Sequence, residues 1–274
     1  MQQKEGSKLA GNTTYSFLKR LSYIFILSSF SFSTSAQEHS NLFFKKAQTV
    51  SYRIHYGFID AGVLECVSDT NSFLIDGHTC FKMAVTGKTT GAAAAFAKIN
   101  DRWITYVDSV TGYPYRFVRA LQENNYTKEE LTEFDRKNAT VVVSNKTDKD
   151  EYNVTTHITT PDAHDMVSAY LSLHAIRFNK LNINDTVHIN VFLEDSTFRF
   201  QIRYLGKEKI KTKYGKRHSY KISPIMPDNS IFSKEEAIIC WLSADADKIP
   251  LKLRAKLVVG AVEMDLERYS GYEK

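Results

Sequence analysis

The sequence has few of the residues from which metal centres and disulfide frameworks are built. It contains only three cysteines in 274 residues, and neither a CxxC pair nor a cysteine–histidine spacing typical of zinc sites is present. It also lacks an HExxH motif and a glycine-rich phosphate-binding loop. We therefore expect neither a metal nor another cofactor.

The three cysteines leave two interpretations open. An exported protein meets an oxidising compartment, where Cys66 and Cys80 could form a disulfide if they lie on adjacent strands of a hairpin centred near Phe73. Cys240 would then be the odd thiol. In the other interpretation all three cysteines are buried apolar thiols.

Catalytic motifs are missing as well. Ser168 does not lie in a G-x-S-x-G elbow. Asp245 and Asp247 could act as paired carboxylates, but a turn explains them at least as well. No catalytic geometry can be assembled, so we predict no catalytic residues. A hydrolase centred on Asp101, Asp165 or Asp245 is a less favoured alternative.

The longest apolar run lies near the start of the chain, at residues 21–32. Lys19 and Arg20 precede it and small residues follow it up to Ala36. This pattern predicts a secretory signal peptide over residues 1–36, cleaved after Ala36. An uncleaved signal anchor is the alternative, although the run is short for a membrane span. No second run of spanning length follows, so we expect an exported protein, periplasmic or associated with the cell surface, without a transmembrane span after signal cleavage.

The basic net charge of +5 belongs largely to this predicted signal peptide. Residues 1–36 carry four basic groups and one acid, so residues 37–274 have a net charge of +2. One basic run remains, KEKIKTKYGKR at residues 207–217. It could bind an anion, but a solvated β-hairpin is the favoured interpretation. We expect no nucleic-acid partner.

Alternation of apolar and polar residues fills most of the sequence after residue 49. Over residues 50–58 every second residue is apolar, and the phase slips around Gly57 and Gly62, which predicts a bulge or bend there. About fifteen such segments follow one another with turn residues between them, as in antiparallel meanders. So many strands do not fit one flat sheet, which must curl or split.

One convincing helix interrupts the strands, within residues 161–178. Asp162 is the expected N-cap, and Asp165 adds negative charge to the first turn. Apolar side chains cover most of the circumference, with Asp165, Ser168 and Ser172 as a narrower polar line, so we expect burial on several sides. An amphipathic helix lying on a flat sheet is the alternative.

These patterns predict a mainly β fold and one β-rich domain over residues 37–274. We expect a large curved antiparallel sheet, either an incomplete barrel or two half-sheets, wrapped around one central helix near residues 163–178. Such an arrangement often leaves an apolar groove beside the helix. The groove candidates are aromatic residues that could equally be core: Tyr52, Tyr56, Phe96, Trp103, Tyr106, Tyr170 and Trp241. The polar candidates are Asp101, Asp165, Ser168 and Asp245.

The order of several sequence motifs resembles that of the exported bacterial domain-of-unknown-function family 3108, over residues 49–269. The motifs are YRIHYGFIDAG (52–62), IDG (75–77), INDRWITYVDSVTGYPYRF (99–117), NNYTKEELTEFD (124–135), HDMVSAYLSLHAIRF (164–178), GKRHSYKISP (215–224) and WLSADADKIPLKLRAKLVVGAVEMDLERY (241–269). The resemblance implies a β-rich exported protein, with no established activity or catalytic residues to carry over. It also implies a shape similar to the wrapped sheet-and-helix folds of periplasmic lipoprotein carriers, and fold alone does not fix function.

With 12% aromatic residues and no catalytic set, the sequence favours binding over turnover. We predict a non-catalytic exported envelope protein that binds an apolar or amphiphilic envelope molecule in a groove between sheet and helix. The alternative is a structural or assembly protein of the envelope, whose partner is another envelope protein and which binds no small ligand.

Overall fold

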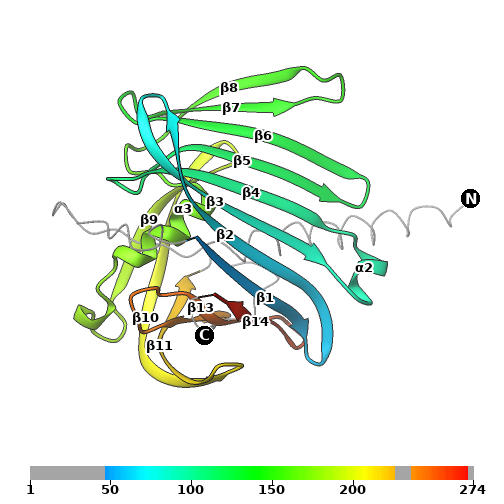
Figure 1. Ribbon diagram of the computed structural model, residues 1–274, viewed down its shortest axis with the longest axis vertical. Coiled ribbons are helices and arrows are strands. Elements are labelled where there is room, and N and C mark those ends of the chain that lie inside the picture. The colour runs from blue at the N-terminus through cyan, green and yellow to red at the C-terminus, as the bar shows by residue number, and fades with distance from the viewer. Residues whose placement is uncertain (1–46, 226–235, 271–274) are drawn as a thin grey trace, which may run out of the picture.

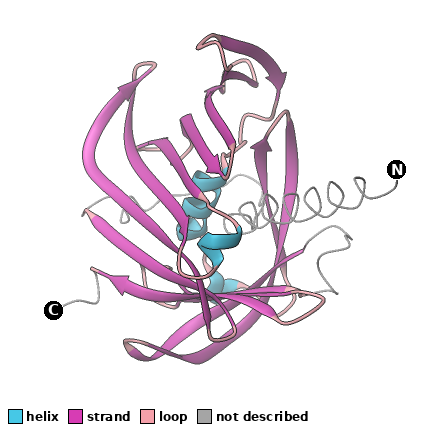
Figure 2. Cartoon of the chain, turned by 90° about the vertical axis from the view of Figure 1, so that its right-hand side faces the viewer, coloured by secondary structure: helices cyan, strands magenta, loops and turns pink. Residues whose placement is uncertain are grey.

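The computed structural model describes residues 47–225 and 236–270. The predicted signal peptide and most of the connection at residues 224–233 lie outside these ranges. Among the described residues, no helix is both long enough and apolar enough to cross a membrane. The described chain forms one antiparallel sheet of 14 strands with a short helix inside its curve (Figures 1 and 2).

About fifteen strands were expected, and the described residues form 14 strands and two short helices. They are β1 (Gln48–Tyr56), β2 (Ile59–Ile75), β3 (His78–Thr89), α2 (Ala93–Phe96), β4 (Asn100–Asp108), β5 (Pro114–Glu123), β6 (Tyr126–Asp135), β7 (Thr140–Lys146), β8 (Tyr152–Ile158), α3 (Met166–Ser172), β9 (Thr186–Leu193), β10 (Ser196–Thr212), β11 (Gly215–Ile225), β12 (Ile238–Ser243), β13 (Pro250–Lys256) and β14 (Ala261–Tyr269). Two single 3-10 turns, Leu173–Ala175 and Phe178–Lys180, follow α3.

The sheet consists of two meanders that join at one seam. Strands β1 to β8 follow one another in space, as do β9 to β14, and β1 pairs with β14 between the two sets. The outermost strands, β8 and β9, are therefore neighbours in sequence that lie at opposite edges of the sheet. The prediction of one curved, incompletely closed antiparallel sheet is confirmed, and the two half-sheets turn out to be parts of it.

Helix α3 lies in the link between those two edges and passes through the inside of the curve (Figure 2). Met166, Val167, Ala169 and Leu171 are buried, and beyond the helix so are Leu173, His174 and Phe178. The expected burial on several sides is thus confirmed. The helix is shorter than expected, because only residues 166–172 are α-helical.

The prediction of Asp162 as N-cap was wrong. The cap is Asp165, whose side chain accepts hydrogen bonds from the backbone N–H groups of Val167 and Ser168. The residues before it are extended because His164 forms a parallel bridge with β9, donating to the carbonyl of Asn190. Asp162 instead accepts hydrogen bonds from the Asn190 side chain.

The phase slip near Gly57 is a hairpin turn rather than a bend within one strand. Gly57 has a φ of 58°, in the left-handed region that glycine adopts readily, and the chain reverses there from β1 into β2. A bulge does accompany the turn, since the pairing register shifts between Ile54 and His55.

The pairing register also excludes a bridge between Cys66 and Cys80. Cys66 lies opposite Val85, whereas Cys80 lies opposite Phe73. Cys80 is five residues along β3 from Val85, about 17 Å at the usual rise per residue, so the two thiols are too far apart to bond. All three cysteines are free and buried, and burial is the largest cause raising their pKa values, to about 12, 11 and 12 for Cys66, Cys80 and Cys240.

Candidate functional site

The candidate site is the inner face of strand β4, which runs past the start of helix α3. Side chains alternate across a strand, and every second residue of β4 is buried: Asp101, Trp103, Thr105 and Val107. The residues between them, Arg102, Ile104 and Tyr106, face the outer side and are more exposed. The buried set includes two polar groups, a carboxylate and an indole, that the sequence had marked as candidates.

Thr105 connects β4 to the helix. Its hydroxyl donates to Oδ2 of Asp165 over 2.6 Å, while Oδ1 of Asp165 accepts the two N–H groups of the first helical turn. Ser168 completes this capping box through its hydroxyl, which accepts from the N–H of Asp165. Both Asp165 and Ser168 therefore act in positioning the helix, and neither carboxylate oxygen of Asp165 is left over for chemistry.

Asp101 lies on the same strand, four residues before Thr105 and away from the contact with the helix. Oδ1 of Asp101 accepts a hydrogen bond of 3.0 Å from the N–H of Gln122, whereas Oδ2 is buried and has no hydrogen-bond partner among the described residues. The pKa of Asp101 is raised to about 7, chiefly by burial; the hydrogen bond from Gln122 and the charge of Arg119 lower it, and Glu123 raises it. Near neutral pH the carboxyl group can therefore either accept or donate a hydrogen bond.

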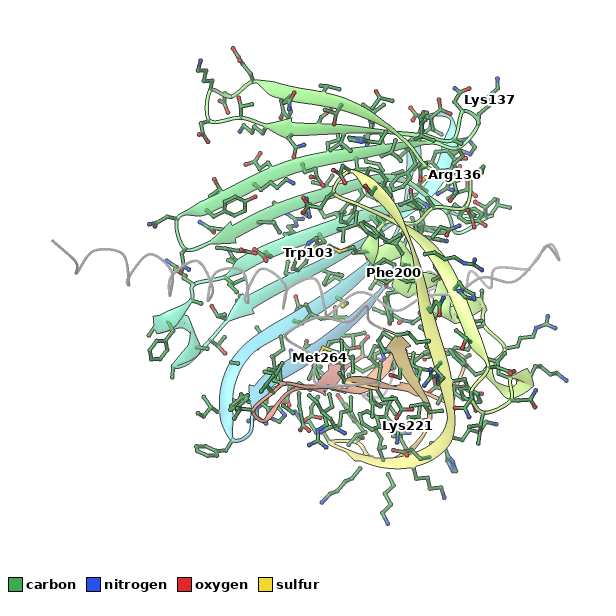
Figure 3. All side chains as sticks on the ribbon, turned by 180° about the vertical axis from the view of Figure 1, so that it is seen from behind. Trp103, Arg136, Lys137, Phe200, Lys221 and Met264 are labelled. Atoms are coloured by element: carbon green, nitrogen blue, oxygen red, sulfur yellow. The ribbon has the colours of Figure 1, made fainter. Side chains whose placement is uncertain are left out.

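Trp103 is the next inward residue, and its Nε1 is a second buried polar atom without a partner in the described residues. Its ring lies over Gly87 of β3: an added Cβ there would stand 3.5 Å from the indole and 3.4 Å from Leu64. Figure 3 shows Trp103 on the N-terminal meander and Met264 on the C-terminal one. Two successive inward positions of one strand thus present an unpaired acceptor and an unpaired donor.

A buried ion-pair network lies beside this pair on β5 and β6. Arg119 donates to Glu130 over 2.7 Å and to Glu194 over 3.3 Å, and Lys128 lies 2.8 Å from the same Glu130. Reasoning from the sequence missed these residues. A signal was present, since Arg119 and Glu123 share the alternation of the apolar residues between them and so point inward.

On the opposite side of the helix, aromatic and thiol side chains gather. Tyr52 and Tyr170 lie near Cys66, Cys240 and Tyr269, and burial raises the pKa values of both tyrosines well above 10. Tyr52 belongs to the core, and Tyr170 is partly buried against it. The structure therefore brings Tyr52 and Tyr170 together.

The remaining aromatic candidates lie away from the helix. Tyr106 points to the outer face, where the centre of its ring lies 5.3 Å from the centre of the Phe73 ring. Trp241 also faces outward and donates through Nε1 to Glu208. Tyr56 is partly exposed and donates to the carbonyl of Val259. Phe96 is 88% exposed.

Asp245 and its neighbours form a polar turn between β12 and β13. Its Oδ1 accepts from the hydroxyl of Ser243 and from the N–H groups of Asp247 and Lys248. Asp245 is exposed, and it lies on the C-terminal meander, whereas Asp101 is buried on the N-terminal one. The structure does not bring the three carboxylates of the hydrolase hypothesis together.

His174 is a buried histidine at the end of the helix. Burial is the largest cause that lowers its pKa, to about 4, so the ring is neutral at physiological pH. Its Nδ1 lies 2.9 Å from the carbonyl of Leu171 and therefore carries the proton, because a carbonyl can only accept. The ammonium of Lys248 donates to the carbonyl of His174 and joins the helix end to the β12–β13 turn.

One group of possible metal ligands was not foreseen from the sequence. The ligand atoms of His55, Glu263 and Asp265 lie within 4.8 Å of one another on the outer side of the β1–β14 seam. Lys252 lies 2.9 Å from Glu263 and 3.2 Å from Asp265, and Arg254 lies 3.2 Å from Glu263. These cations balance the carboxylates, so the arrangement is an ion-pair network across the seam.

Comparison with known proteins gives a family and a fold. The model of the family described as "Protein of unknown function (DUF3108)" matches residues 51–267. No curated protein matches the chain. Among solved structures, a β-barrel-like protein of domain of unknown function DUF1849 from Brucella abortus superposes with a TM-score of 0.54 at 8% identity, over 82% of this chain and 97% of that one. This likeness shows a shared fold.

Two further structures are more distant. One, from Bacteroides fragilis, is described as a candidate exported protein with a YmcC-like fold; its TM-score is 0.33 at 10% identity, over 88% of this chain and 99% of that one. The other, from Parabacteroides distasonis, is described as a candidate lipoprotein; its TM-score is 0.30 at 11% identity, over 89% of this chain and all of that one. At such TM-scores neither carries an argument about this chain.

Proposed function

The chain belongs to the family of proteins of unknown function DUF3108, and we propose that it is a non-catalytic exported envelope protein that binds an amphiphilic molecule inside its curved sheet. The binding site is the inner face of β4 beside helix α3. The polar part of the ligand hydrogen-bonds to Asp101 and Trp103, and its apolar part packs against the core side chains around them.

One observation carries this proposal: Oδ2 of Asp101 and Nε1 of Trp103 are buried without a hydrogen-bond partner among the described residues. A buried polar atom that forms no hydrogen bond costs about 1–3 kcal/mol of stability, and the large majority of buried polar atoms in native proteins have a partner. A bound molecule with a donor and an acceptor would satisfy both. Groups of this kind occur in hydroxyl, amide and phosphate-ester head groups.

The surroundings favour an amphiphile over a wholly polar ligand. Leu64 and the ring of Trp103 both lie over Gly87, and they share one core cluster with Leu121 and Phe117 of β5. Small-molecule sites typically combine such apolar walls with a few fixed polar groups. The hydroxyl of Ser168 lies 3.2 Å from Nδ1 of His164, but it takes part in the capping box of α3, so binding fits the site better than turnover.

A second candidate function is a structural or assembly role in the envelope, without a small ligand. Edge strand β8 favours it: Tyr152, Val154 and Ile158 are 57–86% exposed on one face of a strand that pairs with β7 and has no second neighbour among the described residues. Exposed apolar edges of sheets are ready to pair with another protein.

The proposal is tested by native mass spectrometry of the protein purified from its host envelope, followed by lipid extraction. We expect a bound molecule in the wild-type protein and clearly reduced occupancy in Asp101→Asn and Trp103→Phe. The matched controls are Tyr106→Phe and Trp241→Phe, which change aromatic groups on the outer face and should keep the ligand. A wild-type protein without any bound molecule, or equal occupancy in all four variants, would contradict the site and favour the assembly role.

The predicted export is tested separately by fractionating cells that express the chain with a C-terminal tag. We expect the tagged protein in the envelope fraction, shortened by the predicted signal peptide of residues 1–36. A protein of full length in the cytosol would contradict the exported part of the proposal.

A further inference from the structure

The outer part of the β10–β11 hairpin presents a basic face that the proposed ligand site does not use. Both strands are long, but β11 pairs with β12 only over residues 219–222. Beyond these residues the hairpin continues to the turn at residues 213–214 without a further strand beside it. Figure 1 shows this part curling around one end of the molecule.

The pairing register places the basic residues on one side. Lys209 lies opposite His218 and Lys211 opposite Lys216, and directly opposed residues of a ladder point the same way. Lys207 has the same alternation as Lys209 on β10. We call Lys207, Lys209, Lys211, Lys216 and His218 the lysine face, and all five are exposed.

The opposite side of the hairpin is anchored to the rest of the protein. The intervening residues Glu208, Ile210 and Thr212 are half-buried. Glu208 accepts from the indole of Trp241 and lies 3.4 Å from the ammonium of Lys221, and the hydroxyl of Tyr214 accepts from the N–H of Tyr269. These contacts hold the hairpin so that the lysine face points away from the molecule.

The four lysines are not neutralised by acids. Within the described part of the chain, none of them forms an ion pair, whereas the neighbouring Lys213 and Lys221 each pair with a glutamate. Lys207 instead lies 5.5 Å from the centre of the Tyr220 ring. Along a strand alternate side chains are about 7 Å apart, so the face presents a row of like charges that solvent alone compensates.

We propose that the lysine face docks the protein onto a membrane surface of anionic phospholipid. Its charge is of one sign and exposed, as in the basic segments that bind such surfaces. A nucleic acid is less suited, because single strands need aromatic platforms for their bases, and the ring of Tyr220 beside Lys207 already stacks on Phe178. An exported protein would meet lipid head groups before it meets nucleic acid.

Vesicle sedimentation tests this proposal with the mature protein. We expect the protein to bind vesicles that contain phosphatidylglycerol and not to bind vesicles of phosphatidylcholine alone. Its affinity for the phosphatidylglycerol vesicles should fall as the salt concentration increases. Each lysine near such a surface contributes about a fivefold gain in affinity. Replacing Lys207, Lys209, Lys211 and Lys216 by Gln should therefore weaken binding by about 100-fold or more.

The matched control replaces four exposed lysines elsewhere, Lys88, Lys98, Lys149 and Lys180, by Gln, which changes the net charge by the same amount. This variant should retain most of the binding. Equal losses in both variants would show an effect of net charge alone and overturn the assignment to this face. Binding to phosphatidylcholine vesicles, or equally tight binding to a single-stranded oligonucleotide, would overturn the choice of partner. These outcomes do not bear on the interior ligand site.

Discussion

At the scale of single residues, the surroundings of Asp101 oppose the charged form of its carboxyl group. Its folded pKa of about 7 exceeds the usual 3.8, chiefly because of burial. The folded protein thus keeps a proton that the unfolded chain releases near pH 4. The resulting stability is fully present below that pH and is lost as the pH rises through 7.

The variant Asp101→Asn should remove this dependence on pH. Relative to the wild type, its free energy of unfolding should rise by up to about 4 kcal/mol between pH 4 and pH 8, since the pKa is raised by about three units and each unit corresponds to about 1.4 kcal/mol. Urea unfolding of both proteins across this range measures the difference. A difference that stays constant with pH would contradict the raised pKa.

Arg136 is the residue that ties the link before helix α3 to the N-terminal meander. Its guanidinium donates to the carbonyls of Pro114, Ala163 and Pro161, the first two over 2.8 and 2.9 Å, and lies 4.4 Å from the centre of the Tyr113 ring. Figure 3 shows Arg136 next to Lys137. One planar group with several donors satisfies three carbonyls of two separate segments.

Replacing Arg136 by Met should cost about 2–3 kcal/mol of stability, because partly buried carbonyls lose their donors. Arg136→Lys should recover little of this, since a single ammonium cannot match the fork of the guanidinium. The exposed neighbour provides the control: Lys137→Met should change the unfolding free energy by less than about 0.5 kcal/mol. Unfolding in guanidinium chloride measures the free energy of unfolding of all three variants. Equal stability of Arg136→Met and Arg136→Lys would show that the fork geometry of the guanidinium matters, and not its charge alone.

At the scale of elements, the helix shows what local sequence signals can and cannot predict. Its apolar circumference predicted deep burial correctly, because that property belongs to its own residues. Its start was predicted three residues early, because both Asp162 and Asp165 are good capping residues. The choice between them depends on the bridge between His164 and β9, a tertiary contact with no local signal.

The cap itself can be tested with the two aspartates. Asp165→Ala should destabilise the protein by about 2–4 kcal/mol, because it leaves two N–H groups of the first turn and the hydroxyl of Thr105 without an acceptor in a buried position. Asp162→Ala removes only an exposed contact with Asn190 and should cost less than about 1 kcal/mol. Thermal unfolding measures the loss of stability in both variants. Comparable losses would contradict the assignment of Asp165 as the helix cap.

Part of the candidate site could be predicted from the sequence. Asp101 and Trp103 were both candidates from the sequence, and the alternation along β4 places them on one face and Tyr106 on the opposite face. Strand β12 offered no such signal, because five of its six residues are apolar or aromatic in succession around Trp241. Where both faces of a strand are covered, periodicity no longer tells which side chain points inward.

At the scale of the whole molecule, the antiparallel meanders followed from the spacing of strands and turns, but the seam did not. Strand β1 pairs with β14, so residues such as Ile54 and Met264 meet across more than 200 positions of sequence. No local pattern encodes such a pairing. The pairing of β1 with β14 joins the two half-sheets into one sheet and encloses helix α3 between them.

This seam and the shared core predict that the two meanders unfold together. The chain has two tryptophans, Trp103 on the N-terminal meander and Trp241 on the C-terminal one, and both are buried. Trp103→Phe and Trp241→Phe each leave a single fluorescent probe in one meander. Within each variant, the urea transition followed by fluorescence should coincide with that followed by far-ultraviolet circular dichroism, because one cooperative domain loses both signals at once. If the probe in one meander unfolds at lower urea than the β-sheet signal as a whole, the meanders are separate folding units and the prediction of one domain over residues 37–274 is wrong.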